Sequence, residues 1–316
     1  MGEPCAVPEY IHKPVMAAEV LAALRPAPGG RYADGTVGGA GHAASMLAAS
    51  APTGWLSGCD RDGVAVETAT ARLTARFAGR FELRRGNFAE LAEWVPAGSC
   101  AGVLLDLGVS SPQLDSAERG FSFQQDGPLD MRMDDRQSLT AADLVNGAAE
   151  AELARIFWEY GDERDSRRFA RALAHDRVQR KFATTRQLAE LIERLSPRQG
   201  RKAHPATKVF QALRIAVNDE IGSLRRGLAA AVTLLQPGGR LAVITFHSLE
   251  DRVVKEFGRQ AARDYTFDGP VDVPELRRPC QPVLAWVSRK ALLPGEAELR
   301  ENPRSRSAQL RVFEKI

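Results

Sequence analysis

The first 110 residues of the chain alternate short apolar runs with segments of helical periodicity, and no other feature of the sequence restricts the fold more. The apolar runs predict strands at 31–33, 54–59, 81–84 and 103–107. The intervening segments predict helices at 41–49, 62–77 and 88–95. Strands that alternate with helices of this length pair in parallel through right-handed crossovers. The sequence therefore predicts an α/β fold with a doubly wound, mostly parallel sheet.

The alternation stops after Leu107, and a strand pattern returns only at 240–246. The segment between them is loop-like and then helical, which predicts an inserted helical domain over 113–204. The core is then expected to consist of 1–112 and 205–316.

The second half of the core has its own apolar pattern. Apolar residues recur at spacings of three and four from Phe210 to Leu228, and this helical stripe is expected to pack on the sheet. A further helix is expected at 249–262. Strands at 283–288 and 308–313 are expected to close the sheet.

Basic residues are concentrated in the predicted insert. The segment from Arg164 to Lys202 contains 12 Lys and Arg against four Asp and Glu, although the net charge of the whole chain is only +3. A solvated helix face usually mixes both signs, whereas clustered cations are typical of surfaces that bind phosphates. The residues expected to contact a polyanion are Arg167, Arg168, Arg171, Arg180 and Lys181.

The composition argues against several classes of protein. A chain of 316 residues, 44% of them hydrophobic, can bury a full core, but no stretch approaches the ~18 apolar residues of a membrane span. The first residues lack the apolar segment of a signal peptide, so we expect a cytoplasmic protein with no membrane partner. The cysteines form no Cys-x-x-Cys pair, which indicates neither a disulfide framework nor a metal site; they are Cys5, Cys59, Cys100 and Cys280.

A glycine-rich loop, DGTVGGAGH, follows the first predicted strand from Asp34 to His42. Glycines in the first turn between strand and helix let the backbone approach a ligand closely, and the helix N-terminus offers free N–H donors. The loop is therefore a candidate cofactor site. By itself it is weak evidence, because any tight turn of this kind can use glycine.

Polar or aromatic residues also follow the second and third strands. Asp60 ends the second strand, where doubly wound nucleotide-binding folds place the carboxylate that binds ribose hydroxyls. The alternative role for Asp60 is the N-cap of the next helix, which suits Asp62 better. Phe88 follows the third strand, and its ring would either cover an adenine or pack in the core.

Asp106 ends the fourth strand, directly after a wholly apolar run, and the turn Ser110-Ser111-Pro112-Gln113 follows it. Ligands of open α/β sheets bind beyond the carboxyl ends of the strands. We therefore expect Asp106 and this turn to face the same crevice as the glycine loop. A purely turn-forming aspartate is the weaker interpretation, because the strand delivers Asp106 to the crevice rim.

The run from Asp106 to Asp134, DLGVSSPQLDSAERGFSFQQDGPLDMRMD, resembles the bacterial MraW/RsmH family of ribosomal RNA cytosine-N4 methyltransferases. The resemblance extends in order over nearly the whole chain. It includes His12-Lys13-Pro14-Val15, the DGTVGGAGH loop, His204-Pro205-Ala206-Thr207, Phe210-Gln211-Ala212-Leu213-Arg214-Ile215, PGGRLAVITFHSLEDR at 237–252 and Asn302-Pro303-Arg304-Ser305-Arg306-Ser307.

The resemblance implies a class I, Rossmann-like methyltransferase core that binds S-adenosylmethionine, and an inserted domain that helps to hold RNA. It implies methyl transfer to N4 of a decoding-centre cytidine in 16S ribosomal RNA, in the assembled small subunit. The implied cofactor-binding residues are Asp34, Gly38, Ala40, Gly41, His42, Asp60, Phe88, Asp106 and Gln113. The family usually has glycine at the position of Ala40, where a methyl group would tighten or shift the loop.

Methylation at N4 requires the enzyme mainly to position and rehybridise the amine, because its lone pair is delocalised into the ring. Oxygen acceptors directed at the N4 hydrogens would draw the lone pair out of conjugation as positive charge develops. The candidate catalytic residues are Asp106, Ser110, Ser111 and, through a nearby carbonyl, Pro112. Methylation at C5 would instead need a cysteine in the crevice, and neither Cys59 nor Cys100 follows a strand end.

Several histidines and aromatic residues allow a second interpretation. A strong base is not needed, so His42 is expected as a loop ligand or cap and His247 as a strand-end residue near the crevice. His204, before a proline, is expected to have a structural role at a helix entry. Phe121 and Phe123 would either stack on the flipped target base or pack the insert on the core.

Two rival functions share part of the pattern. A nucleotide-dependent oxidoreductase would also have a glycine loop and an acidic strand end, but the turn after Asp106 has no role in a dehydrogenase. A non-catalytic RNA-binding assembly factor could retain the whole fold. Transfer of labelled methyl groups into RNA distinguishes both from a methyltransferase.

Overall fold

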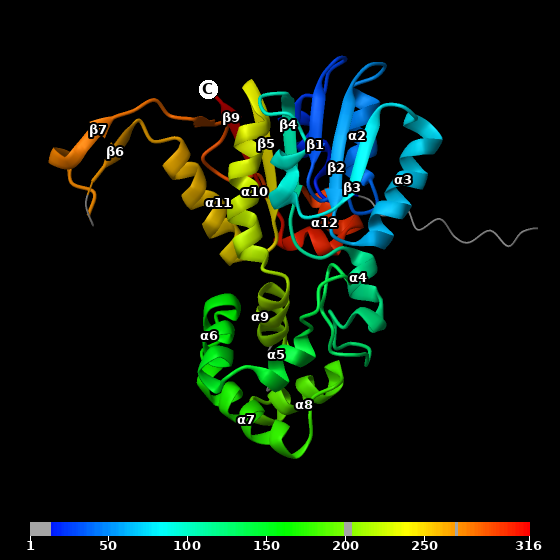
Figure 1. Ribbon diagram of the computed structural model, residues 1–316, viewed down its shortest axis with the longest axis vertical. Helices are drawn as coiled ribbons and strands as arrows, with labels where there is room; N and C mark the ends of the chain where they lie inside the picture. The colour runs from blue at the N-terminus through cyan, green and yellow to red at the C-terminus, as the bar shows by residue number, and fades with distance from the viewer. Residues whose placement is uncertain (1–13, 199–203, 269–270) are drawn as a thin grey trace, which may run out of the picture. The chain divides into compact units, whose positions relative to one another are not determined.

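The computed structural model describes residues 14–198, 204–268 and 271–316 (Figure 1). His12 and Lys13, named above for the family resemblance, lie outside this described part. The chain divides into two compact units, Met1–Gly108 with Arg225–Ile316, and Val109–Leu224. The predicted insert, 113–204, falls within the second unit.

The first unit contains a seven-stranded sheet with the order β3-β2-β1-β4-β5-β9-β8. The strands are β1 (Arg31–Asp34), β2 (Trp55–Asp60), β3 (Phe81–Arg85), β4 (Cys100–Asp106), β5 (Leu235–Thr245), β8 (Leu284–Trp286) and β9 (Gln309–Lys315). The pairs among β1 to β5 are parallel, and β9 is antiparallel to both β5 and β8. The predicted α/β class and doubly wound, mostly parallel sheet are confirmed.

Helices cover both faces of this sheet. Residues of α1, α2 and α3 share one apolar cluster with residues such as Leu104 and Val312 of the strands. Phe313, next in β9, points to the opposite face, where the ring lies against Gly258 of α11. The helices are α1 (Ala17–Leu24), α2 (Gly41–Ala49), α3 (Gly63–Phe77), α11 (Ser248–Ala261) and α12 (Glu296–Glu301).

Shorter elements complete the first unit. The segment predicted as a helix at 88–95 is a 3-10 helix, η1 (Phe88–Glu93), and further 3-10 helices are η3 (Pro274–Leu276) and η4 (Pro303–Ser307). A two-stranded ribbon pairs β6 (Tyr265–Phe267) with β7 (Arg277–Pro279). None of the helices in the described part of the chain is long and apolar enough to cross a membrane.

The second unit is helical and has its own apolar core. Large side chains from several helices meet there, among them Phe157, Phe169, Leu188 and Phe210. Its helices are α4 (Ser111–Asp115), η2 (Ala117–Arg119), α5 (Ala141–Gly147), α6 (Glu150–Gly161), α7 (Ser166–Gln179), α8 (Thr185–Leu195) and α9 (Thr207–Val217). The boundary between the units falls within α10 (Glu220–Leu234).

The expectation that one apolar stripe from Phe210 to Leu228 packs on the sheet was wrong for its first half. The chain bends after α9, where Asp219 adopts a left-handed φ of 45°. Phe210 and Leu213 are buried in the helical core of the second unit. Asn218 fixes the bend, because its Nδ2 donates to the Met131 carbonyl at 2.8 Å. A bend of two residues leaves the three-and-four spacing intact, so the sequence pattern concealed it.

Candidate functional site

Asp34 ends β1 with a side chain that is completely buried. Its Oδ1 accepts a hydrogen bond from the Thr36 N–H at 3.0 Å, whereas Oδ2 has no hydrogen-bond partner in the described part of the chain. Burial raises the pKa of Asp34 to about 6, although His42 and the Thr36 hydrogen bond act in the opposite direction. A buried acceptor without a donor is costly, which is typical of a group that awaits a ligand.

Asp106 lies beside Asp34 at the end of β4, the strand that pairs with β1. Its backbone N–H donates to Thr36 Oγ1 at 2.7 Å, which ties the two strand ends together. The Oδ2 atom of Asp106 lies 3.5 Å from His42 Nε2, in the first turn of α2. The buried atoms His42 Nε2 and Asp106 Oδ1 have no hydrogen-bond partner of good geometry among the described residues.

The pKa of His42 is raised by this arrangement. Burial acts to lower the pKa, but the nearby Asp106 and Asp34 carboxylates outweigh it. Two carboxyl groups and an imidazole therefore converge at the carboxyl edge of the sheet. Such a cluster suits a ligand that carries a positively charged donor.

Asp60 connects the glycine loop to the end of β2. Its Oδ2 accepts from the Gly38 N–H and its Oδ1 from the Asp62 N–H, both at 2.9 Å. Burial raises the pKa of Asp60, and these two hydrogen bonds partly offset the increase. Asp62 is the helix N-cap, as predicted, because its Oδ1 accepts from the Val64 N–H at 3.1 Å. Each carboxylate oxygen of Asp60 can still accept a second donor, such as a ribose hydroxyl.

Ala40 occupies the position in the loop where the MraW/RsmH family usually has glycine. It precedes α2 with φ 62° and ψ 25°, the left-handed conformation, and its side chain is buried. This conformation costs an alanine roughly 1 kcal/mol relative to glycine. The loop thus keeps the glycine-type backbone, and the methyl group is accommodated in the apolar core beside α2.

Phe88 begins η1 immediately after the N-cap Asn87, whose Oδ1 accepts from the Ala89 N–H at 3.1 Å. The ring is half-buried: a Cβ atom added at Gly227 of α10 would overlap it. The Arg61 guanidinium lies 5.9 Å from the ring centroid. The ring therefore packs in the fold on one side, and its contact with an adenine stays a prediction.

Gly227 was missed by the sequence analysis, although it determines how closely Phe88 approaches α10. We predict that Gly227→Ala displaces the ring and weakens binding of S-adenosylmethionine about tenfold, since stacking of a base on an aromatic ring is worth about 1–3 kcal/mol. Isothermal calorimetry measures the affinity. In a Phe88→Ala background the same substitution should have almost no further effect, and additive losses would contradict the explanation.

The Ser110–Gln113 turn belongs to the second compact unit, whereas Asp106 belongs to the first. The turn forms the start of α4, and the Ser110 N–H donates to Gln113 Oε1 at 3.0 Å. Gln113 is buried. One amide oxygen thus stabilises the helix start. The predicted roles of Ser110, Ser111, Pro112 and Gln113 in binding and catalysis stay predictions.

The basic residues of α7 fall into two groups. Arg168 donates to the Leu195 carbonyl, and Arg177 donates to the carbonyls of Val145 at 2.8 Å and Ala148 at 2.6 Å, so both connect helices of the second unit. Arg171 lies 3.6 Å from Glu150. The side chains of Arg167, in α7, and of Arg180 and Lys181, directly after it, are exposed and have no hydrogen bond or ion pair with any described residue.

His204 and His247 have structural roles. His204 Nδ1 accepts from the Ala206 N–H at 3.1 Å, which confirms its role at a helix entry. His247 follows β5 and is the N-cap of α11, where its Nδ1 accepts from the Glu250 N–H at 3.3 Å. Its expected place at a strand end is thus confirmed.

The two phenylalanines considered for base stacking pack inside the second unit. Phe121 is buried in the helical core. The Phe123 ring lies 4.8 Å from the Phe210 ring and 4.7 Å from the His204 ring, measured between centroids. Both rings therefore pack within the second unit, and packing of the insert on the core stays a prediction. Cys59 and Cys100 are buried, and burial raises the pKa of both thiols.

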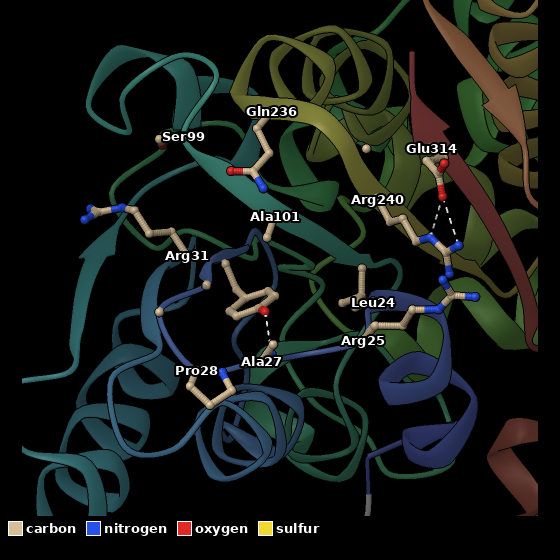
Figure 2. A pocket seen from close by; sticks show the side chains of 14 residues that line it. Leu24, Arg25, Ala27, Pro28, Arg31, Ser99, Ala101, Gln236, Arg240 and Glu314 are labelled. Atoms are coloured by element: carbon tan, nitrogen blue, oxygen red, sulfur yellow. Dashed lines mark hydrogen bonds and ion pairs between the residues drawn. The ribbon is translucent and has the colours of Figure 1, made fainter.

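A pocket of about 500 Å³ lies at the opposite edge of the sheet, where β1, β4 and β5 begin (Figure 2). Two pairs of its polar groups bind one another: Tyr32 accepts from the Ala27 N–H at 2.8 Å, and Arg240 forms an ion pair with Glu314 at 2.9 Å. Ligands of such sheets bind beyond the carboxyl ends of the strands. We therefore place the functional site at the Asp34, Asp60 and Asp106 edge.

Known proteins resemble this chain over its full length. The family model described as MraW methylase family matches residues 9–316. A ribosomal RNA small subunit methyltransferase H from Syntrophotalea carbinolica is 52% identical over 313 residues, which cover 97% of this chain and 98% of that protein. The protein of the same name from Geobacter sulfurreducens is 51% identical over 312 residues, covering 97% and 99%.

These matches agree with the sheet order and with the acidic strand ends of a class I methyltransferase. They span the glycine loop, the carboxylates of the site and the helical unit. On this evidence the chain belongs to the MraW methylase family.

Proposed function

We propose that the protein transfers a methyl group from S-adenosylmethionine to N4 of a decoding-centre cytidine in 16S ribosomal RNA. It would act in the cytoplasm, on the assembled small subunit. The observation that carries this proposal is the convergence of Asp34, His42 and Asp106 beside the glycine loop. The relatives named as small-subunit methyltransferases support the choice of RNA.

The residues at the sheet edge fit this cofactor. Asp34 Oδ2 and Asp106 Oδ1 are buried acceptors without a described partner, and together they suit the ammonium group of the methionine moiety. Asp60 suits the ribose hydroxyls, and Phe88 suits one face of the adenine. The cofactor supplies an electrophilic methyl group on a sulfonium. The Gly38, Ala40 and Gly41 backbone lets it approach the start of α2.

Because the cofactor supplies the reactive methyl group, the residues of the chain mainly have to orient the cytidine N4 amine, which is a weak nucleophile. Ser110, Ser111 and the carbonyl near Pro112 would accept hydrogen bonds from the N4 hydrogens and hold the amine in line for attack. Such positioning converts a bimolecular step into a unimolecular one, which lowers the barrier by several kcal/mol. A strong base is not required, which agrees with His42 being held between carboxylates and His247 serving as a helix cap.

Recognition of the RNA is assigned to the exposed cations of the second unit. Arg167, Arg180 and Lys181 are available to phosphates, whereas Arg168 and Arg177 already bind backbone carbonyls. We predict that the triple variant R167A/R180A/K181A binds small-subunit RNA about 10- to 100-fold more weakly in 0.1 M salt. The slope of log affinity against log salt should fall by about two to three. A filter-binding titration over salt concentration measures both.

The matched control is R168A/R177A, which removes two arginines of α7, the helix that contains Arg167 and precedes Arg180 and Lys181. These side chains tie α7 to α8 and to the end of α5, so the control should lower thermal stability more than the salt dependence. If the triple variant retained the parental salt slope, the second unit would not be the phosphate-binding surface.

The proposed reaction is tested by transfer of labelled methyl groups from S-adenosylmethionine to small-subunit RNA. An oxidoreductase or a non-catalytic assembly factor would incorporate no label. Small-subunit particles from cells that lack the gene are the appropriate substrate, because their target position is unmodified.

A further inference from the structure

The segment 302–307, Asn-Pro-Arg-Ser-Arg-Ser, has no part in the site described so far. It includes η4 and lies between α12, drawn in red in Figure 1, and β9. Ser305 is completely buried, whereas its two neighbours, Arg304 and Arg306, are exposed. The turn thus presents two arginines to solvent on either side of a buried anchor.

Hydrogen bonds fix the backbone of this turn. The Ser305 hydroxyl and N–H both donate to the Asn302 carbonyl, at 2.7 Å and 2.9 Å. The Ala308 N–H then donates to the Ser305 carbonyl at 2.8 Å. Ala308 and Leu310 are buried in the same apolar cluster as α1 and α2. The arginines are therefore carried by an ordered turn, which reduces the entropy lost when they bind a ligand.

A polar contact also links the turn to the cofactor loop. Glu298 of α12 accepts from Asn302 Nδ2 at 3.3 Å and from the Met16 N–H at 3.4 Å. Pro14, two residues before Met16, packs against Gly41 so closely that a Cβ at Gly41 would lie 3.0 Å from its ring. The negative charge of Glu298 also contributes to the raised pKa of His42. The turn is thus connected to the glycine loop through the segment 14–16.

The positive charge of this turn favours binding of an anionic ligand. The segment 302–307 contains two arginines and no acidic residue. The Arg306 side chain has no hydrogen bond or ion pair with any residue that the structure describes, whereas Arg300 of α12 lies 3.9 Å from Glu296. Arginine presents a planar set of donors that matches phosphate oxygens. Because both side chains are exposed, the ligand they suit is an extended polyanion at the surface.

We propose that Arg304 and Arg306 bind backbone phosphates of the substrate RNA next to the cofactor loop. This surface belongs to the first unit and is additional to Arg167, Arg180 and Lys181 of the second unit. The proposal rests on the proposed RNA substrate. It assigns the turn a positioning role: it would hold the strand near the methyl donor, while the cations of the second unit supply further affinity for phosphates.

The test compares R304A/R306A with the parent protein and with R300A, using small-subunit RNA and S-adenosylmethionine separately. We expect the dissociation constant for RNA in 0.1 M salt to rise about 5- to 20-fold in the double variant. The salt slope should fall by about one to two. The affinity for S-adenosylmethionine should stay within twofold, R304K/R306K should recover most of the RNA affinity, and R300A should resemble the parent.

Two results would overturn the proposal. The first is parental RNA affinity and salt slope in R304A/R306A. The second is a loss of cofactor affinity as large as the loss of RNA affinity, which would mean that the turn supports the cofactor loop or binds the cofactor carboxylate. A parent protein that binds RNA but transfers no methyl group would disprove the proposed function and leave this surface intact.

Discussion

Asp34→Asn is expected to weaken binding of S-adenosylmethionine by about two orders of magnitude and, at pH 7.5, to stabilise the cofactor-free protein. The loss of affinity follows because the substitution removes a buried charge that would face the cofactor ammonium, an interaction worth about 2–5 kcal/mol. The gain in stability follows because the charged form of Asp34 is buried without a partner for Oδ2.

The direction of the pH dependence follows from the raised pKa. Folding raises the pKa of Asp34 from its ordinary 3.8 to about 6, so the folded protein holds this proton more tightly than the unfolded chain. Its stabilising contribution is complete below pH 3.8 and is lost as the pH rises to about 6, a difference of up to about 3 kcal/mol. An asparagine, which keeps Oδ1 for the Thr36 N–H, does not titrate.

Thermal denaturation of the two cofactor-free proteins from pH 4 to pH 7.5 measures this effect. The difference in unfolding free energy between Asp34→Asn and the parent should increase in favour of the variant as the pH rises through 4 to 6. A constant difference over this range would show that Asp34 does not carry the buried charge that the site requires. Calorimetry at pH 7.5 provides the affinity for S-adenosylmethionine.

Asp106→Ala is expected to abolish measurable methyl transfer and to weaken cofactor binding at least about 100-fold. The carboxylate offers one buried oxygen to the ligand and holds the other 3.5 Å from His42. Truncation of one partner in a buried charged contact costs about 2–5 kcal/mol. Because Asp106 is the main group that raises the pKa of His42, that pKa should fall in the variant, which an NMR titration of the imidazole detects.

Asp62→Ala is the matched control for this variant. Asp62 is also a carboxylate in the first unit, but its side chain caps α3 by accepting from the Val64 N–H. Its removal should cost about 1 kcal/mol of stability and leave cofactor affinity nearly unchanged. Equal losses of affinity in Asp62→Ala and Asp106→Ala would point to general destabilisation and would refute the role given to Asp106.

The residues at the carboxyl edge of the sheet could be predicted from the sequence, because each directly follows a short strand pattern. Asp60 and Asp106 end predicted strands, and parallel strands bring their carboxyl ends to one edge, so both were expected at the crevice. Asp34 was implied by the family resemblance. The helix at Gly41–Ala49 was predicted to the residue, since the glycine loop marks its start. That Asp34 Oδ2 and Asp106 Oδ1 lack partners among the described residues could not be predicted, because it depends on packing between distant segments.

The helical unit was less predictable for the same reason. A count of cations in α7 does not reveal that Arg168 and Arg177 bind carbonyls of neighbouring helices. Apolar spacing does not reveal the bend at Asp219, because a bend of two residues preserves the periodicity. The role of Gly227 depends on the position of Phe88, which lies more than a hundred residues away in the sequence.

The central claim is the position of the transferred methyl group. Small-subunit particles that lack the modification are incubated with the protein and labelled S-adenosylmethionine, and the RNA is digested to nucleosides. Liquid chromatography with mass spectrometry then separates N4-methylcytidine from C5-methylcytidine and from methylated adenosines. We predict one N4-methylcytidine per particle, dependent on Asp106. Label in C5-methylcytidine or in adenosine, or no label in RNA, would contradict the proposed chemistry.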